Sequence, residues 1–351
     1  MENPSISFSL TIFAISLISS SLLVPILRSI AFKYSILDLP NQSHKTHDTS
    51  VPYLGGFAII IPVCLLSIFN LIFFADSVNF QLHVLLLVIP AVFLSIIGLY
   101  DDIKNLSAKL RFYLQSVMAM SSAIYLNHIG YGVEITGISI IDLIISMIWL
   151  VGITNALNFF DNVDGGAAGI TFIASISVSV LAGIGNQYLI ALMALSLAGA
   201  SLGFLLWNKF PAKIYLGDSG ALFIGFLLAI SLLQFEPKPQ ASIASPLIPV
   251  FILAVPIIDT TVAVISRLKK RNSIFSGGKD HLSHRLISLG FSRRSSVHIL
   301  WSLAVLFSAI GIWLNLAENE KVFGISILGL FGMAILLVWF LRVDTKKLKL
   351  P

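Results

Sequence analysis

Long apolar segments, separated by short polar connections, run along nearly the whole chain. A segment of about 20 mostly apolar residues is long enough to cross a bilayer as an α-helix. Eleven such segments can be recognised, with approximate limits 6–31, 55–75, 81–100, 109–127, 138–157, 167–185, 187–207, 217–234, 243–266, 297–316 and 322–342. Because no connection is long enough to form a separate soluble domain, the pattern predicts one all-α, polytopic integral-membrane domain over residues 1–351.

The charged residues are few and unevenly placed. They make up 11% of the chain, against about 25% in soluble domains. With the N-terminus outside, eleven crossings put all but two of the 22 Lys and Arg residues on the cytoplasmic side, as the positive-inside rule requires. The C-terminus is then cytoplasmic too. We expect the cytoplasmic connections at about 32–54, 101–109, 158–166, 208–216 and 267–296.

The sequence favours neither a cleaved signal peptide nor a nucleic-acid-binding protein. The first apolar segment lacks the basic start and short apolar core of a signal peptide, so we expect it to remain as a membrane helix. The net charge of +5 follows from the bias just described, and no basic module interleaved with aromatic residues predicts binding of nucleic acid.

Carboxylates gather at one predicted membrane surface. Five of them lie in three separate cytoplasmic connections: Asp101, Asp102, Asp161, Asp164 and Asp218. Acidic residues are costly at membrane depth and usually mark function there. Ordinary interfacial charges would not explain five carboxylates on one face, each within a dense polar cluster, so we expect a functional site.

The first cluster predicts a divalent cation. Asp101 and Asp102 are adjacent, and two neighbouring carboxylates ionise together only when a cation is close, either a metal ion or a lysine such as Lys109. Hard oxygen ligands favour Mg²⁺, with Mn²⁺ as a substitute, over Zn²⁺.

The second and third clusters predict irregular backbone beside a polar cavity. Polar residues recur every third position in the second cluster, at Asn155, Asn158, Asp161 and Asp164, and two glycines follow. This spacing suits a helix end that unwinds into a loop, which is tolerated at this depth only beside a polar cavity. In the third cluster Asp218 stands where a helix begins, and Tyr215 could stack on a base or sit in an interfacial aromatic belt.

The longest cytoplasmic connection, 267–296, is strongly basic. It contains His281, His284 and Arg285. Two histidines three residues apart are by themselves a weak metal signal, so with an arginine beside them contact with phosphate is the favoured interpretation. A cationic loop that faces carboxylates is the arrangement expected around a magnesium pyrophosphate.

These clusters, in this order, resemble the polyprenyl-phosphate N-acetylhexosamine-1-phosphate transferase superfamily, glycosyltransferase family 4. The resemblance covers about 38–291 and includes the first cytoplasmic loop with Lys45. It implies a UDP-sugar donor, a polyprenyl phosphate acceptor, release of UMP, a Mg²⁺ cofactor and a site on the cytoplasmic side of the inner membrane. A homodimer is compatible with the resemblance.

The resemblance also implies roles for individual residues. Asp218 corresponds to a magnesium ligand. Asp101 and Asp102 correspond to an essential acidic pair that helps to hold the metal beside the acceptor phosphate, and Asp161 to a further catalytic carboxylate. The residues implied in substrate binding are Lys45, Lys109, Asn155, Asn158, Asp164, Tyr215, His281, His284 and Arg285.

Two positions depart from the family pattern and leave the sugar open. Asn162 follows Asp161 where the family often has glycine, and Ser283 stands where the last motif often has a histidine. A run of consecutive histidines, typical of the MurNAc-pentapeptide translocase branch, is missing, which favours GlcNAc. A 6-deoxy N-acetylated sugar or MurNAc-pentapeptide remains as the alternative donor.

Two further questions stay open at this point. Direct attack of the acceptor phosphate and a two-step route through a phospho-sugar on an aspartate are both compatible with the residues. An ion-coupled transporter is the rival class of function, but its charges would lie near mid-membrane. Asp142 and Asp259 are the candidates for that depth, and we expect a supporting role for Asp259.

Overall fold

A computed structural model describes residues 5–38, 51–74, 78–238, 246–274 and 278–343. Lys45, an expected substrate-binding residue, lies outside the described residues. The elements in chain order are α1 (Ile6–Lys33), β1 (Leu37–Asp38), β2 (Val51–Pro52), α2 (Gly56–Phe74), α3 (Val78–Lys104), α4 (Ala108–His128), α5 (Ser139–Phe160), α6 (Gly166–Ile184), α7 (Tyr188–Asn208), α8 (Gly217–Leu233), α9 (Leu247–Ile252), α10 (Ala254–Lys269), α11 (Leu282–Ser288), α12 (Arg293–Leu316) and α13 (Asn319–Arg342).

A helix occupies each of the eleven predicted segments, and the ninth is split into α9 and α10. The split falls at Leu253, just before Pro256, which has no N–H to donate to the carbonyl four residues earlier. Seven of the described helices are long and apolar enough to cross a membrane by themselves. The chain is therefore an all-α, multi-pass membrane protein, while eleven crossings and their orientation remain predictions.

Helix α8 forms the centre of the bundle. Every residue from Ser219 to Leu232 is buried, and α8 packs mainly against α3 and α5. The outer helices show the opposite pattern, with large apolar side chains exposed on α1 and α13, as expected for surfaces that face lipid. A helix that is apolar all round belongs in the interior of such a bundle.

Small residues allow the closest helix contacts. A Cβ added to Gly199 or Gly203 of α7 would lie 2.4 Å or 2.2 Å from a backbone oxygen of α1. These glycines are the small-xxx-small pair of a membrane packing motif. On α3, a Cβ at Gly98 would lie 2.5 Å from the backbone of Asp218, so Gly98 sets how closely the start of α8 approaches α3.

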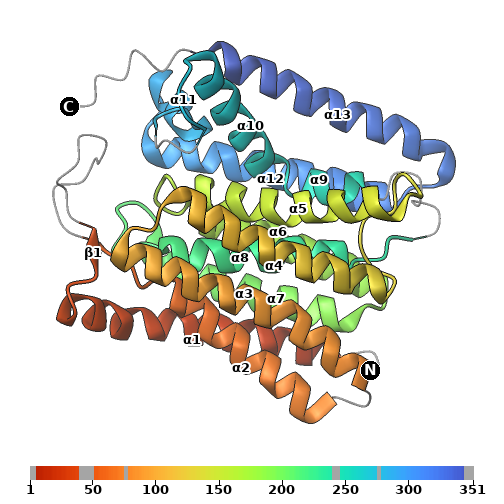
Figure 1. Cartoon of the computed structure of the whole chain (residues 1–351), viewed down its shortest axis with the longest axis horizontal. Helices are drawn as coiled ribbons and strands as arrows, with labels where there is room; N and C mark the ends of the chain where they lie inside the picture. Colours follow the sequence, from red (N-terminus) through yellow and green to blue (C-terminus); the bar gives the residue numbers. More distant parts are fainter. Residues whose placement is uncertain (1–4, 39–50, 75–77, 239–245, 275–277, 344–351) are drawn as a thin grey trace.

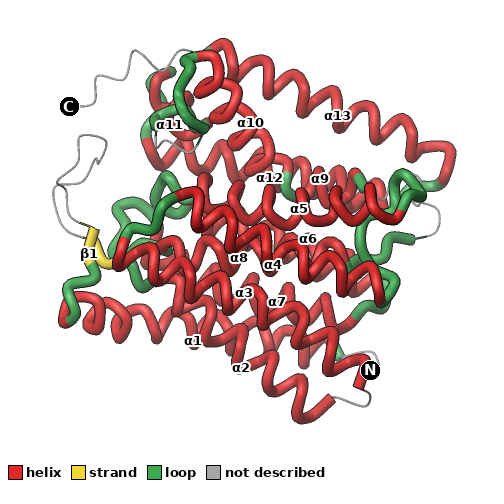
Figure 2. The backbone as a smooth tube through the Cα atoms, in the orientation of Figure 1, coloured by secondary structure: helices red, strands yellow, loops and turns green. Residues whose placement is uncertain are grey.

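The polar connections collect at one end of the bundle. Figure 1 shows that α3 and α5 end, and α4 and α8 begin, on the side that carries β1 and α11, whereas α1 begins on the opposite side. The two short strands form an antiparallel pair at this end, with Leu37 opposite Pro52, and are the only strands among the described residues (Figure 2). The end of α3, the end of α5 and the start of α8 therefore lie at the same end of the bundle, although they are far apart in the sequence.

Candidate active site

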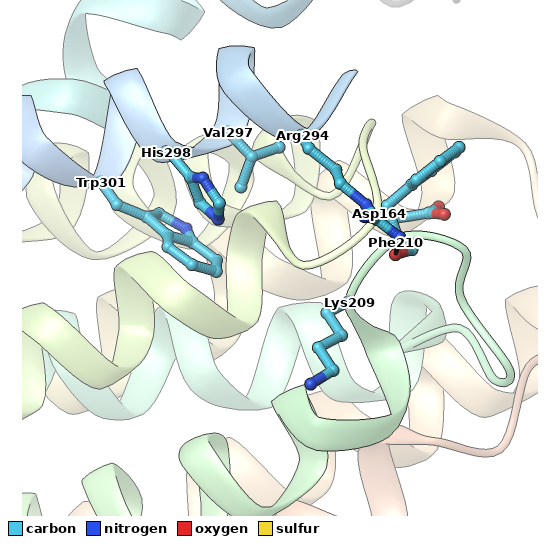
Figure 3. A pocket seen from close by; sticks show the side chains of 7 residues that line it. All are labelled: Asp164, Lys209, Phe210, Arg294, Val297, His298 and Trp301. Carbon is cyan, nitrogen blue, oxygen red and sulfur yellow. Dashed lines mark hydrogen bonds between the residues drawn. The ribbon is translucent and has the colours of Figure 1, made fainter. Parts of the chain in front are cut away.

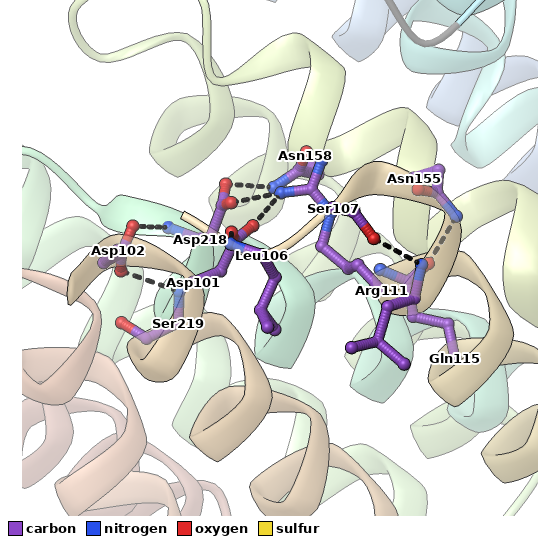
Figure 4. Close-up of polar contacts among 11 residues, drawn as sticks. Asp101, Asp102, Leu106, Ser107, Arg111, Gln115, Asn155, Asn158, Asp218 and Ser219 are labelled. Carbon is purple, nitrogen blue, oxygen red and sulfur yellow. Dashed lines mark hydrogen bonds and ion pairs between the residues drawn. The ribbon is translucent and has the colours of Figure 1, made fainter. Parts of the chain in front are cut away.

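Arg111 of α4 lies at the centre of the acidic cluster. Its guanidinium donates to Asp101 Oδ2 and to Asp218 Oδ2 and so joins the end of α3 to the start of α8 (Figure 4). Asn158, at the end of α5, donates to the other oxygen of Asp218 over 2.7 Å. Asp101 also accepts the N–H of Leu106 over 2.6 Å. The predicted convergence of three connections is confirmed by these contacts.

Asp102 caps the start of α8 from another helix. Its carboxylate accepts the N–H of Asp218 over 2.9 Å and the N–H of Ser219 over 3.2 Å. Helix α8 has no side-chain cap of its own, so Asp102 satisfies two N–H groups that would otherwise lack a partner. Gly217 adopts a φ of 74°, and a Cβ there would lie 2.7 Å from the Asp102 carboxylate. Asp102 therefore fixes the position of Asp218.

Asp161 directly follows the last helical residue of α5, as the spacing of polar residues predicts. Burial raises the pKa of Asp161 well above its usual range, and the negative charges of Asp218, Asp164 and Asp102 raise it further. Four carboxylates thus lie close enough to repel one another. A cation placed among them would relieve this repulsion.

Asp164 holds the next loop in place. Its carboxylate accepts the N–H of Ala212 over 2.9 Å and so ties the α5–α6 connection to the α7–α8 connection. Gly165 then takes a left-handed φ of 76°, and its N–H donates to Asn208 over 3.0 Å. The chain unwinds here as expected, because a glycine can adopt this conformation without strain.

On another side, Asp164 borders a pocket of about 290 Å³ between the α7–α8 connection and the start of α12 (Figure 3). The residues that line it are Asp164, Lys209, Phe210, Arg294, Val297, His298 and Trp301. Its side chains are mixed in charge, with Arg294 reaching toward Asp164 and Phe210.

Three further candidates, Tyr215, Asn155 and Lys109, have different surroundings. The Tyr215 ring lies 6.1 Å from that of Tyr53, and burial, the main cause, raises the pKa of Tyr215, so its hydroxyl stays protonated. Asn155 donates to Gln115 over 2.6 Å and to the Val151 carbonyl, which joins α5 to α4. Lys109 is exposed in the first turn of α4.

The two histidines of the basic loop differ in burial and in their contacts. His281 is buried, with Nδ1 2.7 Å from Asp259 and Nε2 3.2 Å from Arg267. Asp259 also accepts the N–H of Leu282, so its predicted supporting role is confirmed. His284 is only partly buried, and its Nδ1 has no partner among the described residues. Burial and the nearby His281 lower the pKa of His284 to about 4, so its ring is neutral at pH 7.

Arg285 faces the protein interior, and this does not support the phosphate contact expected of it. The guanidinium is 4% exposed and donates to the carbonyls of Asp280, Phe340 and Val343 and to the hydroxyl of Ser266. Its donors bind α10 and the end of α13 to α11. Sequence alone shows that a cation is present in the loop but not that backbone carbonyls surround it.

The two carboxylates that an ion pathway could have used are both engaged. Asp142 accepts the hydroxyl and N–H of Thr136 and two further N–H groups at the start of α5. Asp259 is held by His281 and the Leu282 N–H. These contacts give both carboxylates a structural role and give no support to transport.

Comparison with known proteins decides the family. Residues 84–236 match glycosyl transferase family 4. The chain is 33% identical over 310 residues to a probable undecaprenyl-phosphate N-acetylglucosaminyl 1-phosphate transferase of Bacillus subtilis, an alignment that covers 87% of this chain and 84% of that protein. The chain belongs to glycosyl transferase family 4.

Other relatives in the family carry two kinds of name. A decaprenyl-phosphate N-acetylglucosaminephosphotransferase of Mycobacterium tuberculosis (strain H37Rv) is 31% identical, over 90% of this chain and 85% of that protein. A phospho-N-acetylmuramoyl-pentapeptide-transferase of Halalkalibacterium halodurans is 29% identical, over 86% of this chain and 95% of that protein. Family membership makes the chain a transferase, in agreement with the sequence analysis.

The donor atoms of this family 4 site suit Mg²⁺. Among the described residues no three acidic, His or Cys side chains form a ready-made metal cage. Mg²⁺ does not need one, because it usually binds through one or two carboxylates together with water and substrate phosphates. Asp218 and Asp161 supply such oxygens amid excess negative charge. Arg111 neutralises part of that charge from the side of Asp101.

Arg111 was missed as a site residue by the sequence analysis. The signal for it was present, because a basic residue follows the acidic pair on the next helix. Charge alone did not separate Arg111 from Lys109, and only the packing of α4 beside α3 and α5 shows which of the two reaches the carboxylates.

Proposed function

We propose that this chain transfers N-acetylglucosamine-1-phosphate from UDP-GlcNAc to a polyprenyl phosphate and releases UMP, as an early membrane step in the synthesis of a cell-envelope polysaccharide. The observation that carries the proposal lies at one end of the membrane bundle, where Arg111 joins Asp101 to Asp218 and Asn158 donates to Asp218. The names of the GlcNAc-transferring relatives from Bacillus subtilis and Mycobacterium tuberculosis support the sugar.

The location of the site suits both substrates. The acceptor is an anion on a long isoprenoid and must arrive from within the bilayer, whereas the nucleotide sugar is soluble. The positive-inside bias supports an orientation in which the acidic cluster lies on the cytoplasmic side of the inner membrane. An interfacial site on that side is where the two substrates can meet.

Each site residue has its own role in the proposed phosphoryl transfer. The acceptor phosphate is already close to a dianion, so direct in-line attack needs no strong general base. Arg111 is placed to hold phosphate oxygens, and Asn158 orients Asp218. The neutral His284 offers a ring nitrogen to the sugar or the pyrophosphate. Mg²⁺ held by Asp218 and Asp161 would neutralise charge on the pyrophosphate.

The test is a membrane assay with polyprenyl phosphate, Mg²⁺ and labelled UDP-GlcNAc. We expect UMP and a lipid-linked sugar pyrophosphate, both lost with EDTA or in Asp218→Asn. Glu320→Gln serves as the matched control, because it removes an exposed carboxylate on α13 far from the site along the chain. No UMP from UDP-GlcNAc, with the protein folded, would refute the proposed sugar.

Parallel reactions separate the alternatives. Product from a UDP-6-deoxy-N-acetyl sugar or from UDP-MurNAc-pentapeptide, but not from UDP-GlcNAc, would retain the reaction and change the donor. Incubation with donor alone distinguishes the two routes: we expect no labelled protein, whereas a labelled phospho-enzyme would establish the two-step route.

A further inference from the structure

The acidic turn after α5 (161–164) and the histidine loop (281–285) are joined by a direct side-chain hydrogen bond. Ser283 Oγ in the first turn of α11 donates to Asn162 Oδ1 over 2.5 Å. The amide nitrogen of Asn162 donates in turn to the carbonyl of Phe159 over 2.7 Å, which closes the last turn of α5. Both functional ends of the Asn162 side chain are therefore occupied. Ser283 is 2% exposed, so water cannot readily replace its partner if Asn162 is removed.

Ring contacts also pack the last turn of α5 against α10 and the connection that leads to α11. The Phe159 ring lies 6.2 Å from His281 in an edge-to-face arrangement and 5.3 Å from the guanidinium of Arg267. These contacts hold the two segments together but are tolerant of small shifts in angle. The Ser283–Asn162 bond is directional and determines how α11 is rotated against the end of α5.

The two faces of this turn serve different parts of the site. Asn158 points to Asp218 and the acidic cluster, while Asn162 points to α11. Residue 284 follows Ser283 directly, so the bond also decides where the unpartnered nitrogen of His284 lies relative to the carboxylates. A shift of α11 would move His284 without altering the cluster around Arg111.

We infer that Asn162 and Ser283 are positioning residues for the donor, because their hydrogen bond sets the basic loop in register with the acidic turn. This rests on the proposed function for the identity of the donor. Both positions are ones at which the sequence departs from the family pattern. The pair would therefore act on recognition of the donor sugar and pyrophosphate, and leave recognition of the lipid acceptor unchanged.

The test is a double-mutant cycle on the full chain in lipid nanodiscs, with Ser283→Ala, Asn162→Ala and the double variant. We expect each single change to raise KM for UDP-GlcNAc about three- to tenfold, the range given by loss of one hydrogen bond. The double variant should be no worse than the poorer single variant. KM for polyprenyl phosphate should stay within about twofold, and Ser283→Thr should restore the donor KM.

Ser288→Ala is the matched control. Ser288 lies on the same short helix but donates within it, to the carbonyl of Arg285 over 2.7 Å, so its removal should not change the donor KM. Additive losses in the double variant, or an equal rise in KM for the acceptor, would overturn the inference.

Hydrogen exchange gives an answer that does not depend on turnover. Amides of α11 should exchange faster in Ser283→Ala and in Asn162→Ala, to the same extent, and at the wild-type rate in Ser288→Ala. Unchanged exchange in both single variants would overturn the coupling. If the wild type transfers no sugar phosphate from UDP-GlcNAc, the proposed donor fails, while the exchange measurement still decides whether the pair joins the two segments.

Discussion

Removal of the Asp102 carboxylate separates a structural role from a catalytic one. Its two oxygens accept the N–H groups of Asp218 and Ser219, 2.9 and 3.2 Å away, at the start of a buried helix without another cap. A buried N–H group left without a partner costs about 1–3 kcal/mol, and a cap substitution costs about 0.5–2 kcal/mol. We expect Asp102→Ala to cost about 2–4 kcal/mol, because both bonds are lost together.

Asp102→Asn keeps the shape and one acceptor oxygen, so about half of that cost is expected. The assay is the apparent Tm in detergent at one fixed scan rate, since membrane proteins often unfold irreversibly. Asp102→Ala should lower it by about 4–8 °C. Asp218→Asn should abolish transfer with a much smaller change, because it removes a charge from a crowded cluster and keeps the cap. An unchanged Tm in Asp102→Ala together with lost activity would refute the capping role.

Three further predictions follow from single side chains. Arg285→Met should lower expression and Tm sharply, because it removes the donor from four acceptors in bonds of which three are buried, while any folded fraction keeps the wild-type donor KM; a raised KM at unchanged Tm would instead support the phosphate contact. The raised pKa of Asp161 means that cation binding there competes with a proton, so the apparent Mg²⁺ affinity should rise with pH through the range in which Asp161 titrates, by up to about tenfold per unit, and less steeply in Asp161→Asn; the same pH dependence in both proteins would contradict this. The lowered pKa of His284, about 4, means that the ring becomes charged only as the pH falls toward that value, so His284→Gln should change the donor KM but leave the pH profile between 6 and 8 the same shape, whereas loss of a limb near pH 6.5 would show that His284 titrates there.

Much of the site could be read from the sequence, because its signals are local. The acidic pair at the end of α3, the three-residue spacing after α5 and the aspartate at the start of α8 each stand next to an apolar run of fixed length. Apolar runs long enough to span a bilayer must form helices, and their ends then return to the same surface. The placement of these clusters at one end of the bundle follows from that constraint.

The contacts of each charged group could not be predicted in this way, because they depend on how closely segments far apart in the sequence approach each other. Arg111 and Arg285 carry the same side chain, yet Arg111 reaches two carboxylates whereas Arg285 is enclosed by backbone carbonyls from the connection before α11 and from the end of α13. Asp102 looks like a second metal ligand and is occupied as a cap. The membrane class, the helices and the family of chemistry can be predicted from the chain alone, since burial of apolar surface and backbone hydrogen bonding act along it. Which charge meets which partner depends on the folded packing, because a guanidinium or carboxylate takes its role from the groups that lie within about 3 Å of it.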